Sequence, residues 1–175
     1  MLKHLLKKRI LQINKYEHPD KGGIESVTQQ ISELSSHWIK FKNLSFANYF
    51  KKYQRKTSSV RFASFKLFSQ PLSFRYFLYI LLNIKKYDQV ILHYPNLLGA
   101  LALLISNIKA DIYIYWHSDV VQQNKLLKIF ARRVEKKLLQ KSRCVIFATK
   151  AHRDYSNQDF SSLETKILPY TISNE

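Results

Sequence analysis

The chain has 175 residues, and its 46% hydrophobic and 14% aromatic side chains suffice to bury the core of one domain of ordinary size, which argues against disorder. The single cysteine, Cys144, cannot form an internal disulfide, and a reducing compartment fits it. With 29 Lys and Arg against 12 Asp and Glu, the formal net charge of +17 favours a polyanionic partner: anionic lipid head groups, nucleic acid or phosphorylated substrates.

The amino-terminal half alternates strand-like and helix-like segments. No signal peptide is predicted at the start, because basic residues interrupt its apolar stretches and no small-residue cleavage site follows. Residues 9–14 read as a strand, and an amphipathic helix is predicted from the spacing of Ile24, Val27, Ile31 and Leu34. Short strands are predicted at 42–48 and 59–65, followed by a helix over 71–87 with Pro71 in its first turn.

The carboxyl-terminal half continues this alternation, with strands predicted at 88–93, 110–117 and 143–149 and helices at 96–108 and 124–142. The 96–108 stretch is far shorter than the roughly 20 apolar residues of a membrane-spanning helix, so a buried helix is predicted there. Nearly continuous apolar strands that alternate with helices are typical of a parallel sheet covered on both faces. We therefore predict an α/β fold: a single Rossmann-like domain with a doubly wound, mostly parallel sheet of about six strands.

Polar residues gather where the predicted strands end. In an open parallel sheet, ligands bind beyond the carboxyl ends of the strands. The chain segments expected at that edge are 15–23, 93–96 and 117–119, together with Thr149, Lys150 and His152. Besides His18 in the first of these segments, His93, His117 and His152 all lie at predicted strand ends, so this edge of the sheet is the predicted site.

Gly22 and Gly23, two of only three glycines, lie in the turn between the first strand and the first helix. Glycine lets the backbone bend tightly and come close to a ligand, and the N–H groups at a helix start favour an anion. A phosphate is therefore the predicted ligand of this turn. The alternative is an ordinary turn that binds nothing, because the pattern lacks the G-x-G-x-x-G spacing of a dinucleotide site.

His117 and Asp119 are the candidate catalytic residues. The His117 ring can donate and accept protons at a strand end, and the Asp119 carboxylate can bind sugar hydroxyls or orient the ring. Each has a structural alternative: His117 as a hydrogen-bonded cap of the sheet, and Asp119 as a helix cap. His93 equally fits a packed strand-end residue. A metal site built from His93, His117 and Asp119 lacks supporting ligand spacing, so no metal is predicted.

Four stretches together resemble one family: "KRILQINKYEHPDKGGIESVTQQISEL", "KKYDQVILHYPNLLGALALL", "IYIYWHSDVVQQNKLLKIF" and "KSRCVIFATKAHRDYS" with the later "KILPYTIS". They are similar to the amino-terminal domain of family 4 glycosyltransferases, which have the two-domain GT-B fold. The resemblance covers nearly the whole chain. It is strongest at the P-D-x-G-G-I-E turn, at H-x-P-N after the fourth predicted strand and at W-H-S-D after the fifth.

This resemblance implies a retaining, hexosyl-type glycosyltransferase that acts in envelope or extracellular polysaccharide synthesis, lipopolysaccharide included. A sugar would pass from a nucleotide-sugar to a glycan or lipid-linked acceptor. The resemblance implies that Gly22 and Gly23 approach the donor's diphosphate and sugar and that His117 faces the reacting sugar. The acceptor side would be formed by His93, Asn96 and Lys150. No metal or cofactor is implied, since positive groups and helix starts can neutralise the diphosphate and the nucleotide-sugar is a substrate.

The resemblance also implies a division of labour between two domains. Residues 1–168 correspond to the amino-terminal domain, and 169–175 to the start of the linker, with Thr171 where glycine is usual. The sequence does not continue into a donor domain, so nucleotide-sugar binding by this chain alone is expected to be weak. Activity is expected only with a donor domain, carried for example by a separate polypeptide; a truncated gene product is the alternative.

The basic charge leaves two locations and one rival function open. Residues 34–87 contain no acidic residue but many Lys, Arg, Phe and Tyr, which suits either contact with an anionic membrane or a solvated charged face. The expected location is the cytoplasm, free or peripheral on the inner face of the plasma membrane. The rival function is a non-catalytic basic module that binds membrane or RNA, although no known nucleic-acid motif organises the basic residues.

Overall fold

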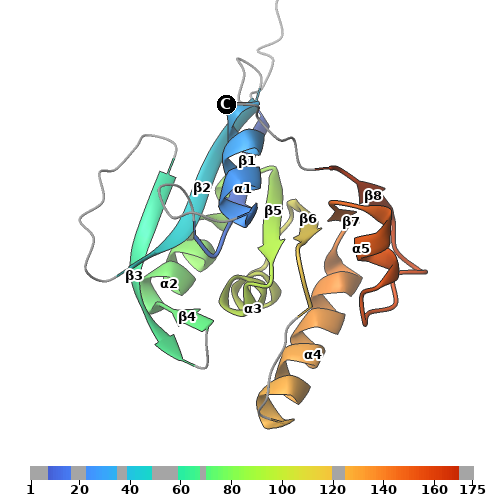
Figure 1. The fold of residues 1–175 in the computed structure, drawn as a ribbon. Helices are drawn as coiled ribbons and strands as arrows, with labels where there is room; N and C mark the ends of the chain where they lie inside the picture. Colours follow the sequence, from blue (N-terminus) through green and yellow to red (C-terminus); the bar gives the residue numbers. More distant parts are fainter. Residues whose placement is uncertain are drawn as a thin grey trace, which may run out of the picture.

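The computed structural model of the chain describes residues 8–16, 23–34, 39–48, 59–67, 70–119 and 125–169. In these residues eight strands form one sheet in the order β4-β3-β2-β1-β5-β6-β7-β8 (Figure 1). Each neighbouring pair is parallel except β3 and β4. The strands are β1 Lys8–Ile13, β2 Ile39–Asn48, β3 Ser59–Leu67, β4 Gln70–Leu72, β5 Gln89–Tyr94, β6 Asp111–Trp116, β7 Cys144–Phe147 and β8 Thr165–Ile167.

The helices in the described residues are α1 Gly23–Glu33, α2 Phe74–Asn83, α3 Leu97–Ile105, α4 Lys125–Lys141 and α5 Lys150–Asp154, with a short 3₁₀ helix, η1 Ile84–Lys86, after α2. The apolar α3 ends at Ile105, earlier than predicted, because Ser106 leaves the helical conformation. Among the residues described, no helix combines the length and the apolar character needed to cross a membrane. The lone Cys144 is buried in β7.

Helices cover both faces of the sheet. Val27 and Ile31 of α1 pack on Tyr115 of β6. The neighbours of Tyr115 along that strand, Ile114 and Trp116, belong instead to the larger core that contains the buried side chains of α2, α3 and α4. Successive side chains of a strand point to opposite faces, so α1 lies on one face and α2, α3 and α4 on the other. The predicted Rossmann-like domain with a mostly parallel sheet is confirmed.

One predicted element begins in the wrong place, and two short strands were not predicted. Pro71 does not open a helix: it lies in β4, an edge strand, where the missing N–H of proline is tolerated. Helix α2 begins after Ser73, whose hydroxyl accepts a hydrogen bond from the N–H of Tyr76 at 3.4 Å. Strand β8 follows the strand predicted at 143–149 and was not predicted. Both additional strands have only three residues, too few to show a period in the sequence.

The strand order reverses between β1 and β5. From β1 the chain builds outward through β2 and β3, then returns to place β5 on the other side of β1. In open α/β sheets the loops at such a switch point diverge and leave a crevice for ligands at the carboxyl ends of the strands. A ligand site is therefore expected at the residues at and just after the ends of β1, β5 and β6.

At Gly99, helix α3 packs tightly against the sheet. A Cβ atom at this position would lie 2.8 Å from Ile13 Cγ2 and 3.1 Å from both Asn96 Oδ1 and Leu92 Cδ1. Ile13 and Leu92 are fully buried and have little room to move. We expect Gly99→Ala to lower the free energy of unfolding by about 1 kcal/mol through overpacking, measured by urea unfolding. In the control Gly23→Ala, the new Cβ meets no atom within 4 Å, and equal losses in the two variants would contradict this account.

Candidate functional site

His93 of β5 and His117, just after β6, meet at the carboxyl edge of the sheet. Nδ1 of His93 lies 3.0 Å from Nε2 of His117. Nε2 of His93 lies 2.9 Å from Oε1 of Gln12 on β1. The three side chains thus form a line of hydrogen bonds across three neighbouring strands, beside the switch point. The structure brings together the two histidines that their strand-end positions singled out.

Gln12 determines which ring nitrogens carry the protons. Its Nε2 lies 3.3 Å from the carbonyl oxygen of Thr28 and 3.1 Å from Oδ1 of Asn43. A backbone carbonyl can only accept, so Nε2 must face Thr28 while Oε1 accepts from His93. His93 therefore carries its proton on Nε2, and its Nδ1 accepts a hydrogen bond from Nε2 of His117. This leaves the lone pair of the His117 ring on Nδ1.

Burial keeps both rings neutral. Burial, and after it the neighbouring His152, lowers the pKa of His117 to about 3. Burial, and after it His117, lowers the pKa of His93 well below its usual value. Both imidazoles are therefore uncharged at physiological pH. A neutral His117 can accept a hydrogen bond from a ligand, but it does not provide a positive charge at the site.

Tyr115 holds the histidine rings in a stack. Its ring centroid lies 4.6 Å from that of His117 and 5.6 Å from that of His93, with the planes within 10° of parallel in both pairs. The Tyr115 hydroxyl donates a hydrogen bond to the carbonyl oxygen of Leu168 at 2.6 Å. The ring plane of His117 is consequently supported by a residue that is itself tied to the segment after β8.

Asp119 is held by the segment that follows α5. Its Oδ1 accepts hydrogen bonds from Trp116 Nε1 at 3.0 Å and Ser156 Oγ at 2.7 Å. Its Oδ2 accepts from the backbone N–H and the side-chain amide of Asn157 at 2.8 and 2.9 Å. Burial would raise the pKa of this carboxyl, but the four hydrogen bonds outweigh burial and lower it. Asp119 therefore stays ionised and fastens the end of β6 to residues 156 and 157.

Asn96 serves the fold. Its side chain caps α3 by accepting a hydrogen bond from the N–H of Gly99 at 2.9 Å. Its amide nitrogen donates to the Asn14 carbonyl oxygen at 3.0 Å and to the Tyr76 hydroxyl at 2.8 Å. Asn96 is only 2% exposed, so both of its N–H groups are used inside the protein. Its predicted contact with an acceptor stays a prediction.

The structure says less about the other predicted site residues, Gly22, Gly23 and Lys150. Gly22 lies outside the described residues, so its predicted contact with a diphosphate stays a prediction. Gly23 begins α1 without a positive φ, so an unusual backbone does not explain glycine there. The space around it is open. Lys150 is the exposed first residue of α5, beyond the carboxyl end of β7.

A row of polar side chains crosses the sheet beside the histidines. The register pairs Tyr115 with His93 and Ser45 with Arg61. Continuing the pairings of β1 by one residue beyond Ile13 places Asn14 between His93 and Ser45. The ladder does continue there, because the Asn14 N–H donates to the carbonyl oxygen of Leu44 at 2.8 Å. Aligned residues of parallel strands share a face, so the whole row points to the α1 side.

Two members of this row have buried side chains without hydrogen bonds. Asn14 and Ser45 are both 0% exposed. In the part of the chain that the structure describes, the side-chain amide oxygen and nitrogen of Asn14 have no hydrogen-bond partner. The hydroxyl of Ser45 has none there either. Such groups cost about 1–3 kcal/mol each and are rare unless a function uses them. The row thus extends the candidate site from the histidines across β1 and β2 toward the charge of Arg61.

The unpaired Ser45 hydroxyl should cost stability. We expect Ser45→Ala to raise the free energy of unfolding by about 1 kcal/mol, because it removes a buried polar group that no atom of the described residues satisfies. Urea unfolding measures this change. The matched control is Ser73→Ala, which deletes the helix-capping hydroxyl of α2 and should lower stability by about 1 kcal/mol. A loss of stability in both variants would show that Ser45 does have a partner.

The sequence alone did not single out Gln12, Asn14, Ser45 or Tyr115. A signal for the first two existed: in "RILQIN" two polar residues stand two positions apart in an apolar strand, and hence on one face. Ser45 and Tyr115 join them only through the pairing of the strands. Among the described residues, no three His, Cys, Asp or Glu side chains come together in a way that could hold a metal ion.

A scan of the chain against protein-family models finds no match, and a search of the curated proteins finds none either. What the chain does must therefore be inferred from its own residues and their geometry.

Proposed function

We propose that this chain forms the acceptor-side domain of a glycosyltransferase, which moves a sugar from a nucleotide-sugar to a glycan or lipid-linked acceptor with retention of configuration. The observation that carries the proposal is the hydrogen-bonded line of Gln12, His93 and His117 at the switch point of the sheet. A neutral ring nitrogen in a largely buried setting is suited to bind a hydroxyl group. The glycosyltransferase-like motifs around His93 and His117 support the same reading.

The residues of the site take different parts in this proposal. His117 is the catalytic residue: its neutral ring faces a hydroxyl of the transferred sugar and holds that sugar in position. His93 and Gln12 are positioning residues, since they fix the proton on His117 Nε2. Asp119 is also a positioning residue, because its four hydrogen bonds fix the backbone just after His117. Lys150 is placed to meet a negatively charged part of the acceptor.

Positive charge near the end of β1 suits the diphosphate of the donor. The pKa of Lys15 is lowered, first by burial and then by the nearby ammonium group of Lys66, while Glu25 raises it in part. An anion that bound near these two cations would relieve their mutual repulsion. The start of α1 at Gly23 adds backbone N–H groups to the same region. No metal is required in this proposal, because these groups can neutralise the leaving diphosphate.

The nucleotide itself is proposed to bind a second domain, carried by the same protein or by a separate polypeptide. A few hydrogen bonds to a diphosphate contribute about 0.5–1.5 kcal/mol each, which corresponds to roughly millimolar binding or weaker for this domain alone. The proposed location is the cytoplasm, where the acceptor-side domain works at or near the inner face of the plasma membrane.

The experiment is a transfer assay with a panel of labelled nucleotide-sugars and a membrane lipid extract as acceptor. The protein is supplied together with its donor domain. We expect one nucleotide-sugar to label the acceptor in the wild type. If no member of the panel is transferred, and mixed RNA binds more tightly than any nucleotide-sugar, the proposal is wrong and the basic binding module is the better description.

A further inference from the structure

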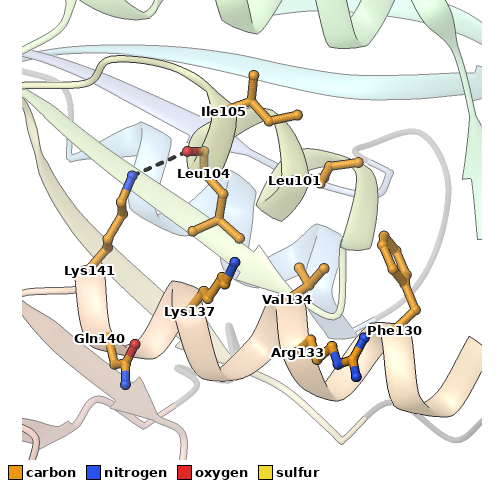
Figure 2. A pocket seen from close by; sticks show the side chains of 9 residues that line it. All are labelled: Leu101, Leu104, Ile105, Phe130, Arg133, Val134, Lys137, Gln140 and Lys141. Carbon is orange, nitrogen blue, oxygen red and sulfur yellow. Dashed lines mark hydrogen bonds between the residues drawn. The ribbon is translucent and has the colours of Figure 1, made fainter.

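A groove runs between α3 and α4, on the face of the sheet away from α1 (Figure 2). Its volume is about 640 Å³. Leu101 and Leu104 of α3 and Val134 of α4 line it with apolar atoms, and Phe130 lies at one end (Figure 2). At the other end, Nζ of Lys141 donates a hydrogen bond to the Leu104 carbonyl oxygen at 3.2 Å. The groove therefore has an apolar interior and the ammonium group of Lys141 at one end.

The border of the groove is positively charged. Arg133 and Lys137 of α4 contribute to its lining, and no acidic residue does among the described residues. The same helix exposes three further cations, Lys128, Arg132 and Lys136. Glu135, the acidic residue of α4, is only 3% exposed and accepts a hydrogen bond from the Tyr94 hydroxyl at 2.6 Å. The outward surface of α4 thus carries positive charge without compensation from its own acidic residue.

Large apolar side chains stand among these cations. Ile105 is 59% exposed, Ile129 50% and Phe130 46%. Apolar side chains this exposed beside a groove indicate an interaction surface. A partner must therefore offer both negative charge and apolar contact.

An anionic membrane meets both requirements. Interfacial helices sink apolar side chains into the boundary between head groups and acyl chains, while Lys and Arg meet the phosphates. Nucleic acid would match the cations but leave the apolar groove without a partner. A second copy of this chain would bring like charges together, and the formal charge of +17 adds to that repulsion.

We propose that the α3–α4 groove docks this chain on a membrane that contains anionic phospholipid. Phe130 and Ile129 enter the boundary layer, and Arg133 and Lys137 contact lipid phosphates. This docking does not depend on sugar transfer. It also places the membrane contact outside the acid-free residues 34–87, which the sequence suggested for that role.

The test is co-sedimentation of the full chain with vesicles of phosphatidylcholine, with and without phosphatidylglycerol. We expect binding only when phosphatidylglycerol is present. The double variant Arg133→Ala/Lys137→Ala should bind about 25-fold more weakly, since each cation near an anionic surface contributes about fivefold. Phe130→Ala should bind about tenfold more weakly, because half of its ring surface no longer enters the boundary layer.

The matched control is Lys85→Ala/Lys86→Ala, which removes two exposed cations from η1, inside the acid-free stretch. We expect it to bind vesicles nearly as well as the wild type. Equal losses in the two double variants would overturn the proposal, because attraction would then depend on total charge alone. It would equally be overturned if the groove variants dissolved a dimer, or weakened RNA binding, without changing the association with vesicles.

Discussion

Replacing His117 by alanine should lower sugar transfer by about 10- to 100-fold, the loss expected when a buried hydrogen bond of about 1–3 kcal/mol is removed from the reacting complex. The variant His117→Gln should recover part of this rate, because its amide oxygen can accept a hydrogen bond near the lost nitrogen. Both rates are measured as kcat/KM with the donor domain present. Alanine at position 117 should leave nucleotide binding nearly unchanged, because the nucleotide is proposed to bind the second domain.

The pH dependence separates a neutral His117 from an acid–base catalyst. Because burial lowers its pKa to about 3, the ring does not change charge between about pH 5 and 8. We expect the wild-type rate to show no ionisation of His117 in that range. A wild-type rate that changes with an apparent pKa of about 6.5, and a His117→Gln rate that does not, would contradict the neutral role.

The buried histidines should make the fold sensitive to acid. The folded-state pKa of His117 lies near 3, whereas an unfolded histidine titrates at about 6.5. Between these values the unfolded chain binds more protons than the folded one, so stability falls as the pH is lowered through this window. At pH 5 the loss from His117 alone is about 2 kcal/mol. His93, whose pKa is also lowered, acts in the same direction.

Urea unfolding of the wild type and of His117→Gln at pH 7 and pH 5 measures this effect. The acid-induced loss in the variant should be smaller by about 2 kcal/mol, since glutamine takes up no proton. Asp119 does not interfere, because a carboxyl with a lowered pKa loses its stabilising contribution only at more acidic pH. Equal losses in the two proteins would mean that His117 is not buried as a neutral ring.

The sequence predicted the central part of the fold well. The apolar runs of β1, β2, β5, β6 and β7 are long enough to be recognised, and the helices between them require parallel pairing. The three-residue strands β4 and β8 could not be recognised from a period. Pro71 was misassigned because proline suits both a first helical turn and an edge strand, and only the pairing with β3 distinguishes them.

The candidate site was predictable where it depends on strand ends and unpredictable where it depends on register. His93 and His117 end neighbouring parallel strands, so their meeting follows from the topology. The roles of Gln12 and Tyr115 depend on the register of β1, β5 and β6, that is, on which residues lie opposite one another. This register cannot be derived from a single sequence. The capping role of Asn96 did have a signal, since asparagine before an apolar helix is a preferred cap.

The most direct test of the account is nitrogen NMR of the histidine side chains, recorded between about pH 5 and 8 with and without the panel of nucleotide-sugars. The account predicts that His117 remains neutral throughout, with its proton on Nε2, and that the Nδ1 signal of His117 shifts when one nucleotide-sugar is added with the donor domain present. A His117 ring that titrates at about pH 6.5, or an Nδ1 signal that does not respond to a nucleotide-sugar that the protein binds, would contradict it.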